Sequence, residues 1–226
     1  MSLRVYAIVP AGQPVRGTGL EGERLRVVKG GPIAAVVGES KTRLAASAAR
    51  VVAYDRLLHH LADQSTAVLP ARFGTYVADE AELLFILRTR RLSLHRAVAH
   101  VRNRAQMTVR LVIERSGDAA TSTRVPGLAP ARSGTAYLHA RANAAAGAAS
   151  LAEFAPLRAA VARWVRDERV EHRGRLATVY HLIPRGAAAA YRRALAREMR
   201  AHGVPVALSG PWVPYAFSAP DEGAGG

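Results

Sequence analysis

Short apolar runs separated by glycine-rich turns open the chain and predict β-structure. Residues 3–9 alternate β-branched and other apolar side chains, which is the pattern of a strand. Residues 24–28 and 33–37 are two further strand-like stretches, and Gly30-Gly31 between them is typical of a tight hairpin turn. The beginning of the sequence therefore predicts one strand followed by a β-hairpin.

Apolar positions at three- and four-residue spacing then predict two amphipathic helices. The first runs from an N-cap at Ser40 to about residue 63, with its apolar positions on one face. The second begins at Asp79, which resembles a capping box together with Glu82 three positions later. Between the helices, residues 68–75 predict a short strand, because a residue that precedes a proline is held extended.

The second half of the chain again alternates strand and helix patterns. Residues 105–114 alternate apolar and polar positions, and residues 175–183 are apolar on both faces, as in a central strand. Residues 186–202 carry the apolar stripe of a helix, for which Gly203 is the expected C-cap. Residues 204–217 then predict a strand that closes the sheet.

These elements predict an α+β protein with two domains, each a mainly antiparallel sheet with helices on one face, close to a ferredoxin-like fold. A break in the pattern near residues 102–104 separates an N-terminal domain, residues 1–103, from a C-terminal domain, residues 104–218. Residues 116–134 are rich in Gly, Ser, Thr, Pro and Ala without periodicity and predict a flexible loop. Residues 219–226 predict a disordered tail.

Composition excludes several classes of function. The 226 residues include no cysteine, so disulfides, thiolate metal sites and cysteine nucleophiles are excluded. The start of the sequence lacks the apolar region of a signal peptide, and no apolar run approaches the roughly 20 residues that span a bilayer. We expect a soluble, cytoplasmic protein with no membrane partner.

The formal net charge of +15 makes nucleic acid a candidate partner. The 32 Lys and Arg residues are spread evenly, however, with 15 in residues 1–103 and 17 in residues 104–226. The tightest cluster, Arg88, Arg90 and Arg91, lies on a predicted helix and is typical of a solvated helix face. We keep a basic, nucleic-acid-binding ferredoxin-like module as the alternative function, on charge alone.

Two motifs are compatible with chemistry, but neither has the context that the chemistry needs. Gly17-Thr18-Gly19-Leu20-Glu21-Gly22 matches the dinucleotide-binding pattern, yet it does not lie directly between a strand and a helix. His59, His60 and Asp63 cluster on a predicted helix, but only His59 and Asp63 share a face, and two groups are too few for a metal site. We predict no catalytic residue, no metal and no cofactor; an enzyme that uses the domain cleft is a third hypothesis.

One stretch, between the two predicted helices, combines proline, arginine and glycine. Leu69 and Pro70 predict an extended segment, and Gly74, which follows Phe73, permits a turn or a bulge. Arg72 lies among apolar neighbours, so we expect a carboxylate or backbone carbonyl groups to hold its guanidinium.

A second stretch, near the end of the sequence, is dense in proline and aromatic residues. Two prolines keep a strand at the edge of a sheet, because proline cannot donate to the ladder. Period-two alternation places Val213, Tyr215 and Phe217 on an inner face. The opposite face, with Trp212, Pro214 and Ala216, then offers a partner-binding surface, for which we name Trp212, Pro214 and the neighbouring Pro211.

Together these stretches resemble the gas vesicle protein family GvpL/GvpF. The resemblance rests on Leu-Pro-x-Arg-Phe-Gly-Thr at 69–75, on Gly-Pro-Trp-x-Pro-Tyr-x-Phe at 210–217, and on matches at Val5–Ile8, Ile33–Gly38, Tyr137-Leu138-x3-Arg141 and Arg175–Ile183. Val213 and Ala216 depart from the family pattern, which usually has Pro and Ser there.

The resemblance implies an accessory or minor structural protein of gas vesicle assembly. Such a protein binds the hydrophobic shell protein and other gas vesicle proteins, and it performs no catalysis. The implied motif residues are Leu69, Pro70, Arg72, Phe73, Gly74, Tyr215 and Phe217.

Overall fold

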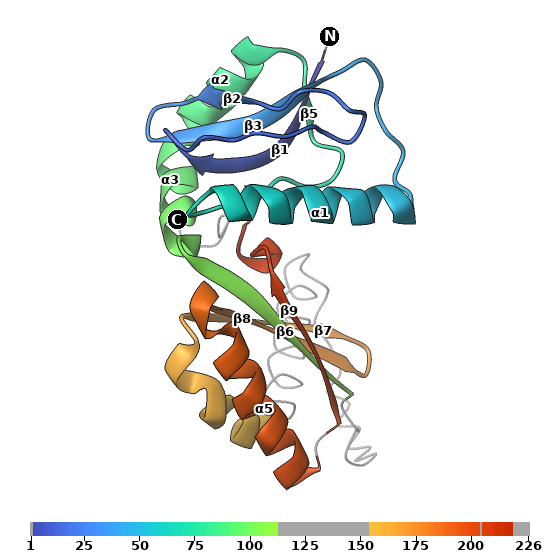
Figure 1. Cartoon of the computed structure of the whole chain (residues 1–226), viewed down its shortest axis with the longest axis vertical. Coiled ribbons are helices and arrows are strands. Elements are labelled where there is room, and N and C mark those ends of the chain that lie inside the picture. The colour runs from blue at the N-terminus through green and yellow to red at the C-terminus, as the bar shows by residue number, and fades with distance from the viewer. Residues whose placement is uncertain (1, 113–153, 204, 219–226) are drawn as a thin grey trace, which may run out of the picture. The chain divides into compact units, whose positions relative to one another are not determined.

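The computed structural model describes residues 2–112, 154–203 and 205–218, and every structural statement below concerns these residues. Contacts within the chain divide it into two compact units, whose helices and strands are labelled in Figure 1. Unit 1 is formed by the described residues of Met1–Gln106, Leu182–Arg185 and Gly210–Gly226, and unit 2 by those of Met107–His181 and Gly186–Ser209.

An antiparallel sheet of five strands forms the centre of unit 1. Its strand order is β2-β3-β1-β4, and β5 also pairs with β1. Val5 lies opposite Val37, and a bulge follows between Val5 and Ala7. The strands are β1 (Ser2–Pro10), β2 (Arg26–Lys29), β3 (Ile33–Ser40), β4 (Leu69–Pro70) and β5 (Tyr76–Val77).

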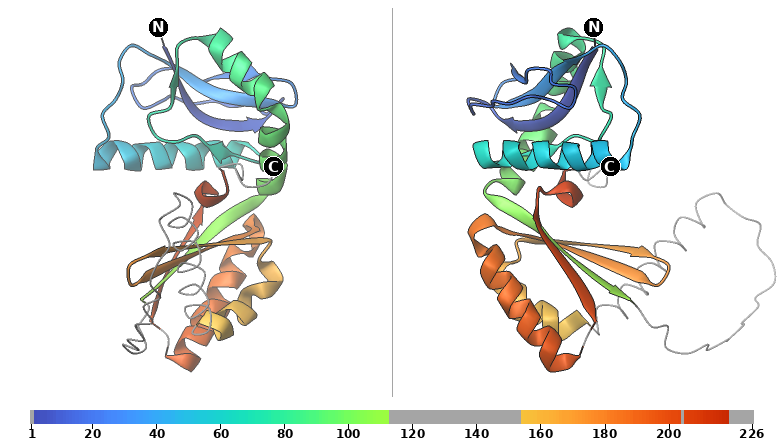
Figure 2. Two further views of the ribbon diagram at one scale, coloured as in Figure 1. Left: turned by 180° about the vertical axis from the view of Figure 1, so that it is seen from behind. Right: turned by 45° about the vertical axis from the view of Figure 1, so that its right-hand side comes forward.

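Both faces of this sheet are covered, which explains why β1 and β3 are buried at almost every position. On one face, Tyr6 and Val36 pack in a core with Leu58 of α1 (Ala48–Gln64). On the other face, Ile8 lies beside Leu87 of α2 (Glu80–Thr89). The sequence predicts helices on one face of each sheet, whereas in unit 1 helices cover both faces (Figure 2).

Helix α1 begins later than the sequence predicts. Ser47 is its N-cap, and the Ser47 hydroxyl accepts a hydrogen bond from the backbone N–H of Arg50. The expected cap, Ser40, is the last residue of β3, and its hydroxyl contacts Arg4. Leu44 lies four residues before Ala48, which is a helical spacing. A prediction from periodicity alone therefore starts the helix too early.

The second predicted helix is two helices, α2 and α3 (Arg91–Val101), which meet at Arg90. Asp79 caps α2 as predicted, because its carboxylate accepts a hydrogen bond from the backbone N–H of Glu82. The chain therefore turns at Arg90 within a segment whose apolar periodicity continues unbroken.

Unit 2 is organised on a four-stranded sheet with the order β7-β8-β6-β9. Met107, Val109 and Leu111 of β6 are buried, as the sequence predicts, but Gln106 and Thr108 between them are buried as well, so the strand is not half-exposed at these positions. Helix α5 ends at Gly203, which has a φ of +62° as expected for a glycine C-cap. The main elements are β6 (Arg104–Val112), β7 (Asp167–Arg173), β8 (Leu176–Pro184), α5 (Ala188–His202) and β9 (Val206–Trp212).

The α+β class with two sheets is confirmed, but the C-terminal segment is placed differently from the predicted domain division. The sequence assigns all of residues 104–218 to the second domain, whereas the described residues from Gly210 onward belong to unit 1. The physical reason is Val213, which is buried in the unit 1 core with Tyr54. The predicted loop at 116–134 and tail at 219–226 lie outside the described residues.

Candidate functional site

The residues that the sequence proposes as a partner-binding surface line a small hollow of unit 1. Its volume is about 150 Å³, and we call it the Trp212 hollow. Helix α1 contributes one wall and the C-terminal segment another. The lining residues are His59, Ala62, Asp63, Arg104, Ala105, Arg185, Pro211, Trp212, Val213 and Pro214.

Trp212 lies at the end of β9 with 36% of its surface exposed. Its indole ring meets the ring of His59 edge-on, with 5.8 Å between the ring centroids. Pro211, which follows a cis peptide bond from Gly210, is exposed beside it. Pro214 is buried, which corrects its expected place on the binding surface. Trp212 and Pro211 thus form the exposed apolar part of the hollow, and Asp63 is its exposed charged residue.

The segment after Trp212 is not a strand, so the expected two-faced alternation is wrong. Tyr215–Phe217 form a 3₁₀ turn, in which residues two apart do not share a face. Val213 and Phe217 are buried, as expected for core positions. Tyr215, expected beside them, is 37% exposed and donates a hydrogen bond to Asp55 at 2.9 Å.

Arg185 is one of the charged residues that line the Trp212 hollow, and sequence reasoning missed it. Its guanidinium donates to the backbone carbonyls of Ala62 at 2.7 Å and Ser65 at 2.9 Å. These carbonyls lie at the C-terminal end of α1, where the helix dipole favours a cation. Burial lowers the pKa of Arg185 while Asp63 acts in the opposite direction, and the group stays a cation. A single arginine after an apolar strand gives no sequence signal for this role.

The other proline-containing stretch mainly builds unit 1. Leu69 and Pro70 are buried and form β4 against β1. Phe73 meets the ring of Tyr54 edge-on, with 5.4 Å between the centroids. Gly74 has a φ of +81°, which favours glycine at this turn. These residues therefore have structural roles.

Arg72 is not held in the way that the sequence predicts. It is exposed, and no ion pair or side-chain hydrogen bond joins it to another described residue. It lies at the edge of an apolar hollow of about 210 Å³ that β1, β4, α2 and α3 line. The prediction fails because a turn lets a charged side chain point outward even between apolar neighbours.

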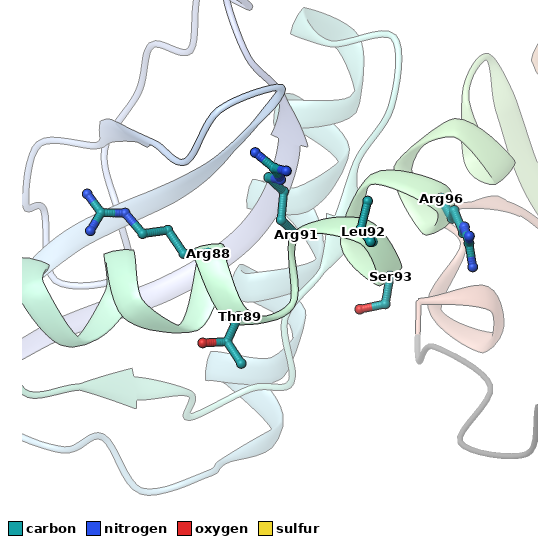
Figure 3. Close-up of a pocket in the computed structure, with 6 residues that line it drawn as sticks. All are labelled: Arg88, Thr89, Arg91, Leu92, Ser93 and Arg96. Atoms are coloured by element: carbon teal, nitrogen blue, oxygen red, sulfur yellow. The ribbon is translucent and has the colours of Figure 1, made fainter. Parts of the chain in front are cut away.

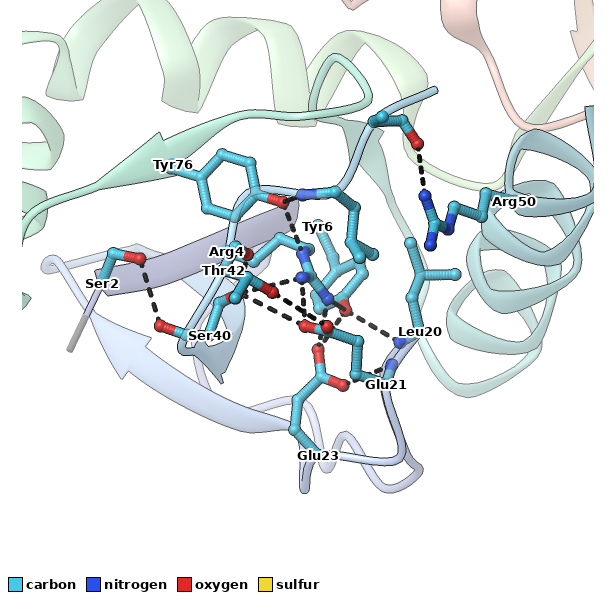
Figure 4. A network of polar contacts seen from close by, with 12 residues as sticks. Ser2, Arg4, Tyr6, Leu20, Glu21, Glu23, Ser40, Thr42, Arg50 and Tyr76 are labelled. Carbon is cyan, nitrogen blue, oxygen red and sulfur yellow. Dashed lines mark hydrogen bonds and ion pairs between the residues drawn. The ribbon is translucent and has the colours of Figure 1, made fainter. Parts of the chain in front are cut away.

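A buried arginine, Arg4, joins a loop to the sheet of unit 1 (Figure 4). Its guanidinium pairs with Glu21 at 2.6 Å and Glu23 at 3.0 Å, and it donates to the hydroxyls of Tyr6 and Tyr76. Burial alone lowers the pKa of Arg4, but hydrogen bonds with Tyr6, Glu21 and Tyr76 raise it above its ordinary value. The hydrogen bond from Arg4 to Glu21 also lowers the pKa of the Glu21 carboxyl group. We call this group the Arg4 network.

The Arg4 network explains the glycine pattern at residues 17–22. A Cβ at Gly19 would collide with the carboxylate of Glu23 and the hydroxyl of Tyr6, so this position requires glycine. Gly22 has a φ of +80°, which also favours glycine. The motif therefore folds a loop around charged side chains of its own protein.

Unit 2 contains a second buried polar group, which we call the His181 network. Nδ1 of His181 lies 2.6 Å from the Tyr191 hydroxyl, and Nε2 lies 2.8 Å from Glu168. The other carboxylate oxygen of Glu168 pairs with Arg158 at 2.8 Å. The hydrogen bond from His181 lowers the pKa of Glu168. His181 and Tyr191 are both 0% exposed, so these groups stabilise the fold and do not face a substrate.

The histidine cluster considered in the sequence does not form. His59 pairs with Asp55, with 3.4 Å between Nδ1 and Oδ2, instead of with Asp63. Within the described residues, no group of three or more His, Cys, Asp or Glu side chains could hold a metal ion.

Comparison with known proteins decides the family. Residues 3–219 match the family described as gas vesicle synthesis protein GvpL/GvpF. The chain belongs to the GvpL/GvpF family. No curated protein matches the sequence.

Solved structures of gas vesicle proteins have the same fold as this GvpL/GvpF chain. GvpF from Anabaena sp. PCC7120 is 12% identical with a TM-score of 0.73, and the match covers 96% of each chain. GvpF from Microcystis aeruginosa is 12% identical with a TM-score of 0.69, and the match covers 96% of this chain and 99% of that one. At this identity the two structures establish the fold alone.

The family description concerns gas vesicle synthesis and names no reaction. None of the helices in the described part of this GvpL/GvpF protein has the length and apolar character needed to cross a membrane. The two stretches that carried the resemblance, residues 69–75 and 210–217, both belong to unit 1.

Proposed function

We propose that this protein is a non-catalytic accessory or minor structural component of gas vesicle assembly. It binds the hydrophobic shell protein and other gas vesicle proteins, and it acts in the cytoplasm at the forming vesicle. The observation that carries this proposal is the family match over residues 3–219. The absence of a metal-ligating group among the described side chains is compatible with it.

The Trp212 hollow is the surface that we propose for the shell protein. A strongly apolar shell subunit aggregates through its own helices and strand edges unless another protein holds it. A partly exposed indole ring beside an exposed proline gives such a subunit a rigid apolar contact. Because Pro214 is buried, the proposal rests on Trp212 and Pro211 alone.

The test compares Trp212→Ala with Phe217→Ala in a pull-down of purified shell protein and in thermal unfolding. Phe217 is 2% exposed, so its truncation should cost about 3–5 kcal/mol of stability. Trp212→Ala should reduce capture of the shell protein while it lowers the melting temperature only slightly. Leu176→Ala is the matched control, because Leu176 in unit 2 is 37% exposed and Trp212 36%.

Capture that is weakened equally by Leu176→Ala would show that general surface hydrophobicity, and not the Trp212 hollow, binds the shell protein. Unfolding by Trp212→Ala as severe as that by Phe217→Ala would show that Trp212 belongs to the core. Either result would remove the Trp212 hollow from the proposal, and the family assignment would stand.

A further inference from the structure

Helices α2 and α3 carry a basic surface that the proposed function does not use. It surrounds a hollow of about 460 Å³ where the two helices meet (Figure 3). The lining residues are Arg88, Thr89, Arg91, Leu92, Ser93 and Arg96. Together with Phe85, one turn before Arg88, we call this the α2–α3 surface.

Two large apolar side chains accompany the arginines of this surface. Phe85 is 68% exposed and Leu92 is 67% exposed, the highest values among the exposed large hydrophobic residues that the structure describes. Phe85 and Arg88 are three residues apart on α2, and Leu92 and Arg96 are four apart on α3, so each pair shares a helix face. Apolar and basic groups therefore alternate across the surface.

The charge of the α2–α3 surface is not neutralised within the described part of the protein. No ion pair there involves Arg88, Arg91 or Arg96. The first turn of α3 has neither an acidic residue nor a side-chain cap hydrogen bond, so no carboxylate of this turn faces the arginines. The nearest acidic pair on α2, Glu80 and Glu82, lies at the far end of that helix.

The β2–β3 turn packs against the base of this surface and fixes its geometry. A Cβ at Gly30 would lie 2.7 Å from the Cβ of Leu87, so only glycine permits this approach. A Cβ at Gly31 would be 3.7 Å from the Arg91 side chain, which places the Arg91 stem over the turn. A surface that is ordered before binding loses less entropy when a partner docks.

We propose that the α2–α3 surface docks an acidic amphipathic helix of a partner protein. Carboxylates of the partner pair with the three arginines, for which the planar guanidinium group is well suited, and its apolar side chains cover Phe85 and Leu92. A bare polyanion would leave both apolar side chains exposed. A second copy of this chain, with a formal net charge of +15, lacks the required acidity.

The test measures fluorescence anisotropy of a labelled synthetic helix with leucine at positions i, i+3, i+4 and i+7 and glutamate elsewhere. Two matched peptides replace every glutamate by lysine or every leucine by serine, and a single-stranded oligothymidine probes nucleic-acid binding. The variants are Arg88→Glu/Arg91→Glu/Arg96→Glu and Phe85→Ser/Leu92→Ser. The control is Arg192→Glu/Arg193→Glu/Arg200→Glu, which makes the same charge change on exposed positions of α5 in unit 2.

We expect the acidic amphipathic helix to lose at least about tenfold in affinity with each α2–α3 variant and less than about threefold with the α5 control. The lysine and serine peptides should bind more weakly than the acidic amphipathic helix. Trp212→Ala should leave the binding unchanged, which separates this surface from the Trp212 hollow. Thermal unfolding confirms that each variant is folded.

Three results would overturn the proposal. If the acidic amphipathic helix does not bind, the α2–α3 surface does not dock the proposed partner. An equal loss with the α5 control would show that net charge alone attracts the peptide. Tighter binding of oligothymidine, unaffected by Phe85→Ser/Leu92→Ser and reduced by the arginine reversal, would identify a nucleic-acid surface instead.

Discussion

Two buried polar networks, one in each unit, hold charge in different ways. Arg4 in unit 1 is a permanent cation that faces two carboxylates, Glu21 and Glu23. His181 in unit 2 is an imidazole ring between a phenol and a single carboxylate, Glu168. The Arg4 network therefore places one cation against two carboxylates, whereas the His181 network consists largely of hydrogen bonds that neutral groups can also make.

The two networks also differ in the segments that they connect. The Arg4 network joins β1 to the loop of Glu21 and Glu23 and, through Tyr76, to β5. The His181 network joins β8 to β7 and α5. Removal of Arg4 would leave Glu21 and Glu23 without their cation, although the loop keeps hydrogen bonds to Tyr6 and Ser40 and the burial of Leu25 in the core.

Each unit can be followed separately because each contains one of the two tryptophans of the chain. Trp212 belongs to unit 1 and Trp164 to unit 2. In a Trp164→Phe background fluorescence reports on unit 1, and in a Trp212→Phe background it reports on unit 2. The following comparisons use these two backgrounds.

The largest expected effect is that of Arg4→Ala on unit 1. The substitution leaves Glu23 and the Tyr6 hydroxyl near each other without the cation that compensates them. Loss of one partner from a buried ion pair costs about 3–5 kcal/mol. Denaturant unfolding followed by Trp212 fluorescence should show this loss, with little change in the signal of Trp164.

Arg26→Ala is the matched control for Arg4→Ala. Arg26 pairs with Glu80 at 2.6 Å, but both side chains are well exposed, so its loss should cost less than about 1 kcal/mol. Equal losses of stability for the two substitutions would mean that the burial of Arg4 does not increase the contribution of its ion pairs to stability. The contrast between the two networks would then be wrong.

The second prediction concerns the pH dependence of unit 2. His181 holds the pKa of Glu168 below its ordinary value, so the charged carboxylate stabilises the folded state. This contribution is complete above the unfolded pKa and is lost as the pH falls through the lowered folded value. Glu168→Gln should therefore cost about 1–3 kcal/mol at neutral pH, and the difference from wild type should shrink below about pH 4.

The measurement is urea unfolding followed by Trp164 fluorescence between neutral pH and pH 3. Glutamine keeps the shape of glutamate and an oxygen that accepts from Nε2–H of His181, so the comparison isolates the charge. A difference that stays constant or grows toward acid pH would show that the Glu168 charge does not stabilise unit 2.

Most of the fold follows from sequence because local patterns fix the elements. The Asp79 cap and the Gly203 cap are chemical signals within one turn of the helix ends, and both are present in the structure. The prediction that Ser40 caps a helix is wrong, because a serine at the end of a strand gives the same local sequence signal as a serine at a helix N-cap. Arg4 was also missed, since an arginine in an apolar strand shows nothing of the carboxylates that follow 17 and 19 residues later.

The candidate site was predicted only in part, because its geometry depends on a change of local structure. Period two holds along β9, but the chain turns after Trp212, and the alternation that placed Tyr215 inside and Pro214 outside then ends. Arg185 lines the same hollow and donates to the carbonyl of Ala62, although the two residues are more than 100 positions apart in the sequence. No periodic pattern contains such a contact.

The smallest expected effect is that of Arg158→Ala in the His181 network. Arg158 pairs with Glu168 at 2.8 Å, but half of its side chain is exposed, so water and salt screen the pair. Its loss should cost less than about 1 kcal/mol, and Glu168 should keep its hydrogen bond from His181 and most of its lowered pKa.

This last comparison decides whether exposure or network membership sets the energy of a charged residue. Arg4 and Arg158 both pair with glutamate at less than 3 Å, yet Arg4 is 2% exposed and Arg158 is 50% exposed. Unfolding followed by Trp164 fluorescence, repeated at high salt, should show a small cost for Arg158→Ala that salt removes. A cost near that of Arg4→Ala, unchanged by salt, would mean that the His181 network is as dependent on its cation as the Arg4 network is.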